Sequence, residues 1–401
     1  MKKTLVILLI AAMVFSLVAC TPAATTPPAE EKSQAPAEES AQTPTEESTE
    51  PEASTEDAGP LAGKKLAFIN AGPDDYYAAF GNAFVAVAKD YGCTDITEVN
   101  SEYKAEKELA NVQDMISAGC DAIAVISANA AGSAAAIAEA NAAGVPIFYC
   151  GGRPELQEGS SIQGHVTDSF IQMGYLAGKW VAENYPEAKC VTIPGQLGQR
   201  MAEGEVVGFK MALQEAGMEE LKVLASGGWQ KELTIPIMEA LIDSGEEFDV
   251  VFAANDETAF GVIQVLKERG ITIKQYPDDG KEGVVVVSNN GKDTGWDAMV
   301  AGDLAISVPN PPSLTADLCV QQMVAHFGGT AYEPYIQISP SIILDATNTD
   351  KGISWDLDTY MQQRADNVFT WALADYEASY MAIKDKLEEF DKLVDEYMAA
   401  Q

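Results

Sequence analysis

Short apolar runs alternate with amphipathic segments along most of this 401-residue chain, and this alternation constrains the fold more than any other feature. Residues 65–70, 122–126 and 145–150 are apolar runs of strand length, and helical patterns separate them. The run at 122–126 has no polar position, which is typical of a strand buried on both faces of a parallel sheet. Glycine follows the helical patterns directly, as at Gly144, where it supplies a left-handed cap. The pattern therefore predicts a doubly wound α/β fold.

The same rhythm restarts after a strand expected at 161–166. It continues through a helix at 205–216 and strands at 190–193, 250–253 and 284–288. Roughly 340 residues of foldable chain exceed one ordinary core, so we expect two similar lobes, each built on a doubly wound parallel sheet. The carboxyl ends of the strands would face each other across a cleft, which is the default position for a binding site in such folds.

The N-terminus has the pattern of an export signal that ends in a lipidated cysteine. Lys2 and Lys3 precede an apolar stretch too short to span a bilayer, and the string LVAC, which ends at Cys20, looks like a bacterial lipobox. We interpret residues 1–20 as a lipoprotein signal peptide and lipobox. Cys20 would then carry lipid such as palmitate and hold the protein at the outer face of the cytoplasmic membrane. The alternative is an uncleaved N-terminal helix.

Residues 21–60 form a compositionally distinct segment. They include seven prolines, ten acidic residues and one lysine, with no Val, Ile, Leu, Met or aromatic residue. Such a segment cannot bury enough apolar surface to offset its ordering entropy, so we expect a flexible acidic tether. The formal net charge of the whole chain is −36, which disfavours nucleic acid and anionic lipid surfaces as partners.

The cysteine spacing argues against a metal site, and the absence of catalytic motifs argues against enzyme chemistry. Five cysteines besides Cys20, with no C-x-x-C pair, and only two histidines give no disulfide framework or zinc site. No G-x-S-x-G, H-E-x-x-H or phosphate-loop motif occurs. We therefore expect no cofactor, no metal and no enzymatic activity, although glycosidase chemistry, which needs only carboxylates, stays open.

Three segments carry a resemblance to a known family. The strings VPIFYCGGR, FAANDETAFGVIQVL and VVVVSNNG resemble the ribose-binding protein family, the type I periplasmic sugar-binding proteins that serve ABC importers. The resemblance covers about residues 61–348. It implies the periplasmic-binding-protein-like I fold, in which a three-strand hinge joins the lobes. We expect the chain to cross between the lobes near Thr167, Pro309 and Ile343.

The resemblance also implies a domain organisation. The N-terminal lobe would comprise residues 61–167 plus 309–342, and the C-terminal lobe residues 168–308 plus 343–352. Residues 353–401 would form a helical C-terminal extension, because apolar residues recur there at helical spacing. Packing of this extension on the protein's own lobe, dimerisation and partner docking all stay open, with a monomer expected.

A sugar site needs aromatic plates and planar polar groups that both donate and accept hydrogen bonds. The resemblance implies that nine residues bind the ligand, namely Asp74, Tyr76, Tyr77, Arg153, Arg200, Trp229, Asn255, Asn290 and Asn310. For the asparagines the alternative is a turn or helix-cap role, for Trp229 it is packing, and for the two arginines it is a surface position.

Two departures from the family pattern bear on the identity of the ligand. The loop before Arg153 is one residue longer and lacks the family's acid, and Asn290 stands where the family often has aspartate. With fewer carboxylates for charge-assisted hydrogen bonds, ribose is not implied over another pentose, a hexose, a sugar alcohol or a nucleoside.

The resemblance implies an extracytoplasmic solute-binding lipoprotein. It would capture a sugar or sugar-like molecule between two closing lobes and deliver it to an ABC import permease. The alternative is a ligand-sensing lipoprotein that presents a nucleoside, an autoinducer-like molecule or a sugar to a membrane sensor kinase or chemoreceptor. The sequence does not decide between transport and sensing.

Overall fold

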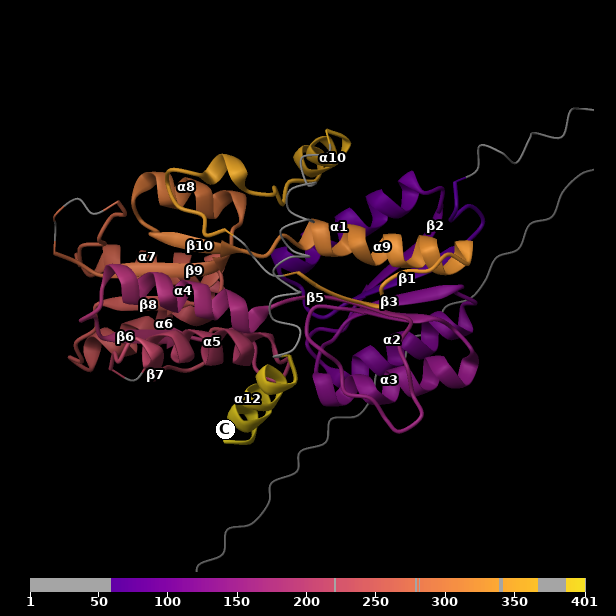
Figure 1. Ribbon diagram of the computed structural model, residues 1–401, viewed down its shortest axis with the longest axis horizontal. Helices are drawn as coiled ribbons and strands as arrows, with labels where there is room; N and C mark the ends of the chain where they lie inside the picture. The colour runs from indigo at the N-terminus through magenta and orange to yellow at the C-terminus, as the bar shows by residue number, and fades with distance from the viewer. Residues whose placement is uncertain are drawn as a thin grey trace, which may run out of the picture. The chain divides into compact units, whose positions relative to one another are not determined.

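The computed structural model describes residues 59–219, 221–277, 280, 282–338, 342–366 and 387–400. The predicted signal peptide, Cys20 and all but the last two residues of the predicted tether lie outside these described residues. The described part contains two parallel sheets, each covered by helices on both faces (Figure 1). The predicted fold class, two similar doubly wound lobes, is confirmed.

The first lobe contains a six-stranded parallel sheet with the order β11-β5-β4-β3-β1-β2. Its chain first runs through β1 (Lys65–Asn70), α1 (Asp75–Asp90), β2 (Asp95–Asn100), α2 (Ala105–Ser117), β3 (Ala122–Ile126), α3 (Ala130–Ala143), β4 (Ile147–Cys150) and β5 (Gly164–Asp168). It returns later with α9 (Pro312–Gly328) and β11 (Tyr335–Ile338), which pairs with β5 in parallel. Strands that are adjacent in space are thus far apart in sequence at this edge.

The second lobe contains a five-stranded parallel sheet with the order β10-β9-β8-β6-β7. Its elements are α4 (Phe170–Asn184), β6 (Cys190–Ile193), α5 (Met201–Glu215), β7 (Lys222–Val223), α6 (Lys231–Asp243), β8 (Val250–Ala253), α7 (Asp256–Glu268), β9 (Val285–Asn290), α8 (Asp293–Ala301) and β10 (Ile306–Pro309). Left-handed glycines end several helices, as at Gly302 after α8.

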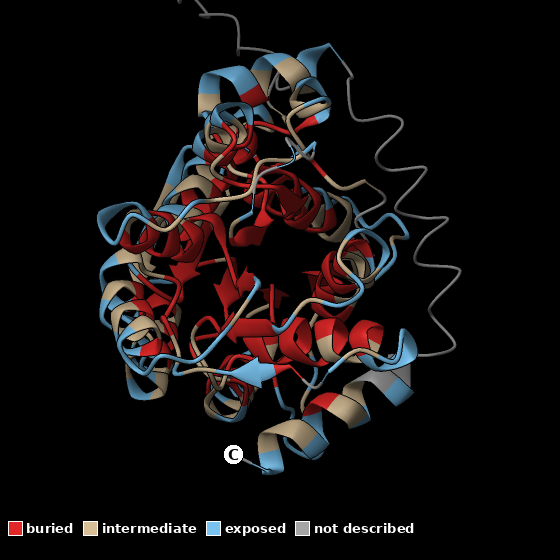
Figure 2. Cartoon of the chain, turned by 90° about the vertical axis from the view of Figure 1, so that its left-hand side faces the viewer, coloured by how far each residue is buried: buried red, intermediate tan, exposed pale blue. Residues whose placement is uncertain are grey.

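Alternate residues of each strand build two separate cores per lobe. In β1, Phe68 faces α1 and α9, whereas Ile69 faces α2 and α3. Phe68 stacks on Phe80 of α1 with ring centroids 5.1 Å apart. In the second lobe, Phe252 stacks on Phe209 of α5 at 4.4 Å. The strands other than β2, β7 and β11 are almost entirely buried, while the outer helix faces are exposed (Figure 2). Each buried Phe stabilises the fold by roughly 1.5–3 kcal/mol.

Two elements begin at other positions than the sequence pattern predicts. The fifth strand spans Gly164–Asp168 instead of 161–166, so that Asp168 stands at its carboxyl end. Helix α5 begins at Met201, one turn before the expected Glu205, because Arg200 adopts a left-handed conformation with φ 68° and ends the preceding loop. Glu203 and Glu205 therefore lie inside the first turns of α5, where both are buried.

The described chain passes between the lobes at more places than predicted. It passes from β5 to α4, from β10 to α9 and, after β11, to Leu344, which pairs with Ser307 beside the second sheet. A further passage follows the short 3-10 helix η2 (Thr349–Lys351), because Ile353 and Tyr360 belong to the core of the first lobe.

Two helices of the predicted C-terminal extension lie among the described residues. Helix α10 (Leu357–Ala365) packs against α1 of the first lobe, and α12 (Leu387–Ala399) packs against α5 of the second. Residues 367–386, which hold part of the predicted apolar stripe, lie outside the described residues. The described helices of the extension therefore contact both lobes of their own chain.

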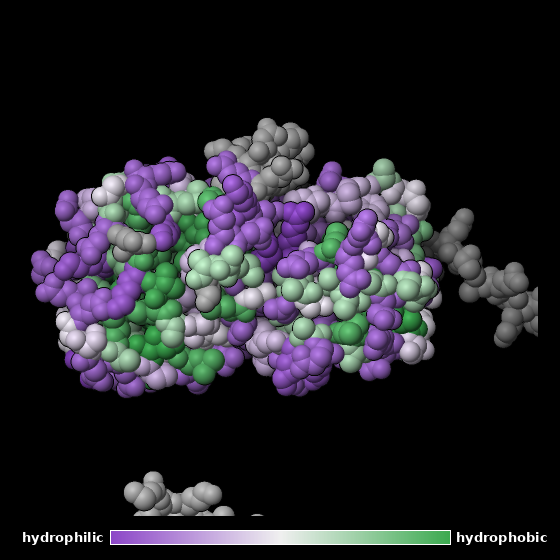
Figure 3. All heavy atoms as spheres, turned by 90° about the horizontal axis from the view of Figure 1, so that it is seen from below, coloured by the Kyte–Doolittle hydropathy of each residue, from purple (hydrophilic) through white to green (hydrophobic). Residues whose placement is uncertain are grey.

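Hydrophobic side chains are exposed only singly in the described part of the chain. The large ones more than a third exposed are Leu156, Val223, Leu233 and Val300. Seen from below, hydrophilic residues cover much of the surface and hydrophobic ones gather mainly on the left-hand half (Figure 3). No described helix combines the length and the apolar character that a membrane-spanning segment requires. All five described cysteines are buried and free.

Candidate ligand-binding site

A cavity lies where α1 of the first lobe meets the loops of the second, and we call it the ligand cavity. Its empty space amounts to about 320 Å³, including space that is open to solvent. Its lining residues are Asp74, Tyr76, Tyr77, Phe170, Met201, Glu205, Trp229, Asn255, Asn290 and Asn310. The structure thus brings together all the residues predicted for ligand binding except Arg153 and Arg200.

The wall from the first lobe is the N-terminus of α1. Asp74 caps this helix by accepting a hydrogen bond from the backbone N–H of Tyr77 at 3.2 Å, and it also accepts one from the hydroxyl of Tyr103. The cap places Tyr76 and Tyr77 in the first turn, with their rings edge to face at 5.4 Å. Both aromatic rings therefore reach the cavity from a fixed helix end.

The facing wall of the second lobe is built around Trp229. Its backbone has φ 65°, a strained value for a bulky residue, and its carbonyl accepts a hydrogen bond from the Asn255 amide at 3.2 Å. A Cβ at Gly195 would lie 2.1 Å from the indole ring, so only glycine leaves room for this orientation. The indole is thus held as a rigid plate, 7% exposed.

Gln199 joins the two aromatic walls, and the sequence interpretation missed it. Its amide nitrogen donates to the Tyr77 hydroxyl at 3.2 Å and to the Ser127 carbonyl at 3.0 Å. Its amide oxygen accepts from the indole N–H of Trp229 at 3.1 Å. Gln199 is fully buried, and its hydrogen bonds couple Tyr77 of one lobe to Trp229 of the other. Its place in a glycine-rich loop between two elements gave no periodicity signal.

The three asparagines reach the cavity from the carboxyl ends of strands. Asn255 caps α7, because its side-chain oxygen accepts from the Thr258 N–H at 2.8 Å, so the alternative cap role is realised alongside the position in the cavity. Asn290 ends β9 with φ 95°. Asn310 follows β10, and its amide nitrogen, in the orientation that satisfies its neighbours, donates to the Asp168 carboxylate at 2.9 and 3.2 Å.

Carboxyl groups in and beside the cavity are deeply buried. Burial raises the pKa of Asp74 to about 6, although the hydrogen bond from Tyr103 opposes this shift. Burial likewise raises the pKa of Asp168 to about 8 and that of Glu205 well above its ordinary value. Sequence reasoning missed Glu205, since the helix was expected to begin at this residue and not one turn earlier.

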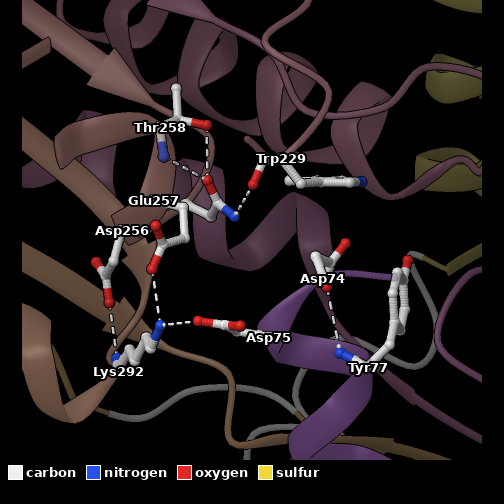
Figure 4. Close-up of polar contacts among 9 residues, drawn as sticks. Asp74, Asp75, Tyr77, Trp229, Asp256, Glu257, Thr258 and Lys292 are labelled. Carbon is white, nitrogen blue, oxygen red and sulfur yellow. Dashed lines mark hydrogen bonds and ion pairs between the residues drawn. The ribbon is translucent and has the colours of Figure 1, made fainter. Parts of the chain in front are cut away.

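A lysine beside the cavity is already paired. The Lys292 ammonium lies 2.6 Å from the Asp75 carboxylate and 2.7 Å from the Glu257 carboxylate, which come from opposite lobes (Figure 4). Its backbone N–H donates to Asp256 at 2.7 Å. This ion pair therefore links the lobes at the rim of the ligand cavity.

Trp355 covers the same rim from the predicted extension. Its ring lies edge to face against Tyr76, with centroids 5.5 Å apart, and its backbone N–H donates to the Asp293 carboxylate at 2.7 Å. The neighbouring Ser354 hydroxyl donates to the other oxygen of Asp293, also at 2.7 Å. Sequence reasoning missed this contribution because it placed residues beyond 352 outside the binding lobes.

The structure places Arg153 and Arg200, both predicted to bind the ligand, outside the lining of the ligand cavity. Arg153 follows the longer loop and pairs with Asp391 of α12, with its side chain 61% exposed. Arg200 pairs with Asp395 and lies 3.4 Å from Asp391. We call these four residues the α12 contact. Three of them, Arg153, Arg200 and Asp391, border a second cavity of about 530 Å³.

Residues 66–331 match the model of the periplasmic binding protein domain. The chain is 26% identical over 242 residues to a galactofuranose-binding protein from Escherichia coli K12, covering 59% of this chain and 74% of that protein. It is 25% identical over 253 residues to a ribose import binding protein from Haemophilus influenzae, covering 61% and 79%. A xylitol-binding protein from Mycolicibacterium smegmatis is 26% identical over 252 residues, covering 61% and 67%.

Solved structures share the fold. The periplasmic binding protein of an arabinose ABC transporter from Shewanella sp. ANA-3, bound to L-arabinofuranose, has a TM-score of 0.66 at 20% identity, covering 76% of this chain and 97% of that one. A Caulobacter myo-inositol binding protein has a TM-score of 0.64 at 16% identity, covering 72% and 95%. At these identities the likeness establishes the architecture alone.

Proposed function

Because the chain belongs to the periplasmic binding protein domain family, we propose that it captures a sugar or sugar-like small molecule between its two lobes. The observation that carries this proposal is the pair of aromatic walls, Tyr77 and Trp229, which belong to different lobes and are joined by Gln199. Aromatic faces suit the C–H faces of a sugar ring, and the amides of Asn255, Asn290 and Asn310 suit its hydroxyls.

Capture would work by shifting the balance between open and closed lobes. A ligand that touches both walls binds the closed state better than the open one, and only this differential affinity drives closure. The ion pair of Lys292 with Asp75 would form on closure, since these two residues come from opposite lobes, whereas Glu257 lies in the same lobe as Lys292. The closed form would then be delivered to an ABC import permease.

Anchoring at the membrane is the second part of the proposal. The relatives are solute-binding proteins rather than enzymes, and their family works outside the cytoplasm. The lipobox-like sequence ending at Cys20 would hold this protein at the outer face of the membrane, close to its permease. Fractionation of cells that express the Cys20→Ala variant tests this: we expect the protein to leave the membrane fraction. Unchanged membrane retention would argue against lipidation.

The capture proposal is tested by calorimetric titration of the chain with pentoses, hexoses, sugar alcohols and inositols. We expect at least one of these compounds to bind, and Trp229→Ala to abolish that binding. Trp180→Ala is the matched control, because Trp180 is 8% exposed, packs in the same core as Trp229 and does not line the cavity. Equal loss in both variants would show that general destabilisation, not the cavity wall, is responsible.

A further inference from the structure

The ligand cavity has an unusual balance of charge. Among the described residues that line it, Asp74 and Glu205 are acids and none is lysine, arginine or histidine. Asp168 lies just behind Asn310, and Glu203 stands two residues before Glu205 in α5. Lys292, at the rim, is engaged by Asp75 and Glu257. The described lining of the cavity therefore contains acidic side chains and no cationic one.

Glu205 is the clearest sign that a partner is missing. Its side chain is 1% exposed and lines the cavity, and its Oε2 atom has no hydrogen-bond partner in the described structure. Burying a carboxylate oxygen that has no hydrogen-bond partner costs several times more free energy than burying one that has a partner. A cationic donor on the ligand would satisfy this oxygen and lower the cost of burying the acid.

The aromatic lining suits a cation as well as a sugar ring. Tyr76, Tyr77, Trp229 and Phe170 surround the same space, and the electron-rich face of an aromatic ring attracts an ammonium group. Carboxylate oxygens together with aromatic faces are the pairing by which proteins hold amines. The cavity therefore offers both kinds of contact to a protonated nitrogen.

Helix N-termini at the cavity do not offer a matching site for an anion. A first-turn backbone N–H of α1 already donates a hydrogen bond to the Asp74 side chain. A first-turn N–H of α7 donates in the same way to the Asn255 side chain. An anionic ligand would thus meet capped helix ends and acidic side chains. Charge repulsion would disfavour it.

We propose that the captured ligand is a sugar or cyclic polyol that carries a protonated amino group, held by Glu205 and Asp74 from opposite lobes. This inference rests on the proposed function and narrows it to the class of amino sugars and amino polyols. Hydrogen bonds between an ammonium group and carboxylates are shorter and stronger than those to neutral hydroxyls. The amine therefore selects the ligand, while the asparagines hold the remaining hydroxyls.

The experiment is calorimetric titration of the chain with matched compounds. The probes are D-galactosamine, D-glucosamine and 1-amino-1-deoxyinositol, each compared with its hydroxyl parent and its N-acetyl derivative. We expect at least one amine to bind about tenfold or more tightly than both its parent and its N-acetyl form. Glu205→Gln should reduce this preference about tenfold. Glu203→Gln is the matched control, since Glu203 is equally buried on the same helix but does not line the cavity.

The outcomes separate the two proposals. Parents that bind as tightly as the amines would overturn the amine inference and leave sugar capture standing. A preference for the amine that survives unchanged in a folded Glu205→Gln protein would overturn the role of Glu205. If Glu205→Gln does not fold, Asp74→Asn replaces it with the same expectation. Failure of every amine and every parent to bind would count against sugar capture and this inference together.

Discussion

The ligand cavity and the α12 contact both join the two lobes, yet their charges are balanced differently. The cavity buries carboxyl groups beside aromatic rings, with no cationic side chain among its described lining residues. The α12 contact holds both arginines predicted for ligand binding, and aspartates at its exposed edge neutralise them. The comparison teaches that Arg153 and Arg200 pair with the C-terminal helix, while the acids of the cavity have no cationic side chain among the described lining residues.

The charged groups of the two regions also differ in their exposure to solvent. Ion pairs with half-exposed side chains contribute about 0–1 kcal/mol, because water screens them. Acids in the cavity have little water, so burial raises the pKa of Asp74 and Glu205. Changes in or beside the cavity should therefore alter binding or pH response, whereas changes at the α12 contact should alter stability only slightly.

The largest effect is expected from Gly195→Ala. The added Cβ would lie within about 2.1–2.3 Å of the Trp229 indole and force this ring to move. We expect loss of sugar binding and a decrease of about 1–3 kcal/mol in the free energy of unfolding, measured by titration and urea denaturation. Gly328→Ala serves as control, because no atom lies within 4 Å of its Cβ position. Unchanged ligand binding in Gly195→Ala would contradict the assignment of this cavity as the ligand-binding site.

The next effect concerns pH. The pKa of Asp168 rises from 3.8 unfolded to about 8 folded, so between these pH values the folded state binds more protons. The free energy of unfolding should then fall as pH rises, by at most about 1.4 kcal/mol per pH unit from this group. His165, whose pKa burial lowers from 6.5 to about 4, has the opposite slope between those two values.

Asp168→Asn isolates this contribution. Subtracting its pH profile from that of the unchanged protein should leave a difference that grows from pH 4 to pH 8, measured by urea denaturation at each pH. The exposed Asp358→Asn should leave the profile unchanged. A flat difference between Asp168→Asn and the unchanged protein would contradict the burial of this acid.

A smaller effect is expected from Asp391→Asn at the α12 contact. This change weakens the pairs with both Arg153 and Arg200, whose side chains are 61% and 13% exposed. We expect a loss of about 1 kcal/mol in low salt that shrinks in high salt, measured by urea denaturation. Sugar binding should stay the same. A large loss of affinity would show that α12 shapes the cavity and would break the comparison.

The smallest effect is expected from Arg153→Gln. Within the described part of the chain its exposed guanidinium forms an ion pair with Asp391 only, so the change should cost less than about 0.5 kcal/mol by thermal or urea denaturation. Ligand affinity should be unaltered. A drop in affinity of tenfold or more would restore Arg153 to the site that the sequence resemblance implied.

The fold could be predicted because its signals are local. The all-apolar strand Ala122–Ile126 and glycines such as Gly144 mark strand burial and helix ends without reference to distant residues. The residues that follow strands, such as Asn255 and Asn310, could be placed near the cavity because parallel strands share one carboxyl edge.

The remaining parts of the site depend on contacts between distant segments. Gln199 gains its place only by touching Tyr77 and Trp229 together, and Trp355 only because the chain returns to the first lobe after residue 352. Arg153 and Arg200 were assigned to the cavity because the docking of α12 more than 190 residues later leaves no local signal. The spacing of apolar residues in the C-terminal extension predicted helices, but not the helices against which they pack.

The position of Trp355 bears on how fast a bound molecule leaves. It borders the rim beside Asp74 and Tyr76 and is held to the second lobe through Asp293. A molecule leaving on this side must push aside an indole whose backbone is anchored on one lobe and whose ring rests on the other. The segment that carries Trp355 lies outside the matched domain. It would then govern the residence time of the ligand rather than its affinity.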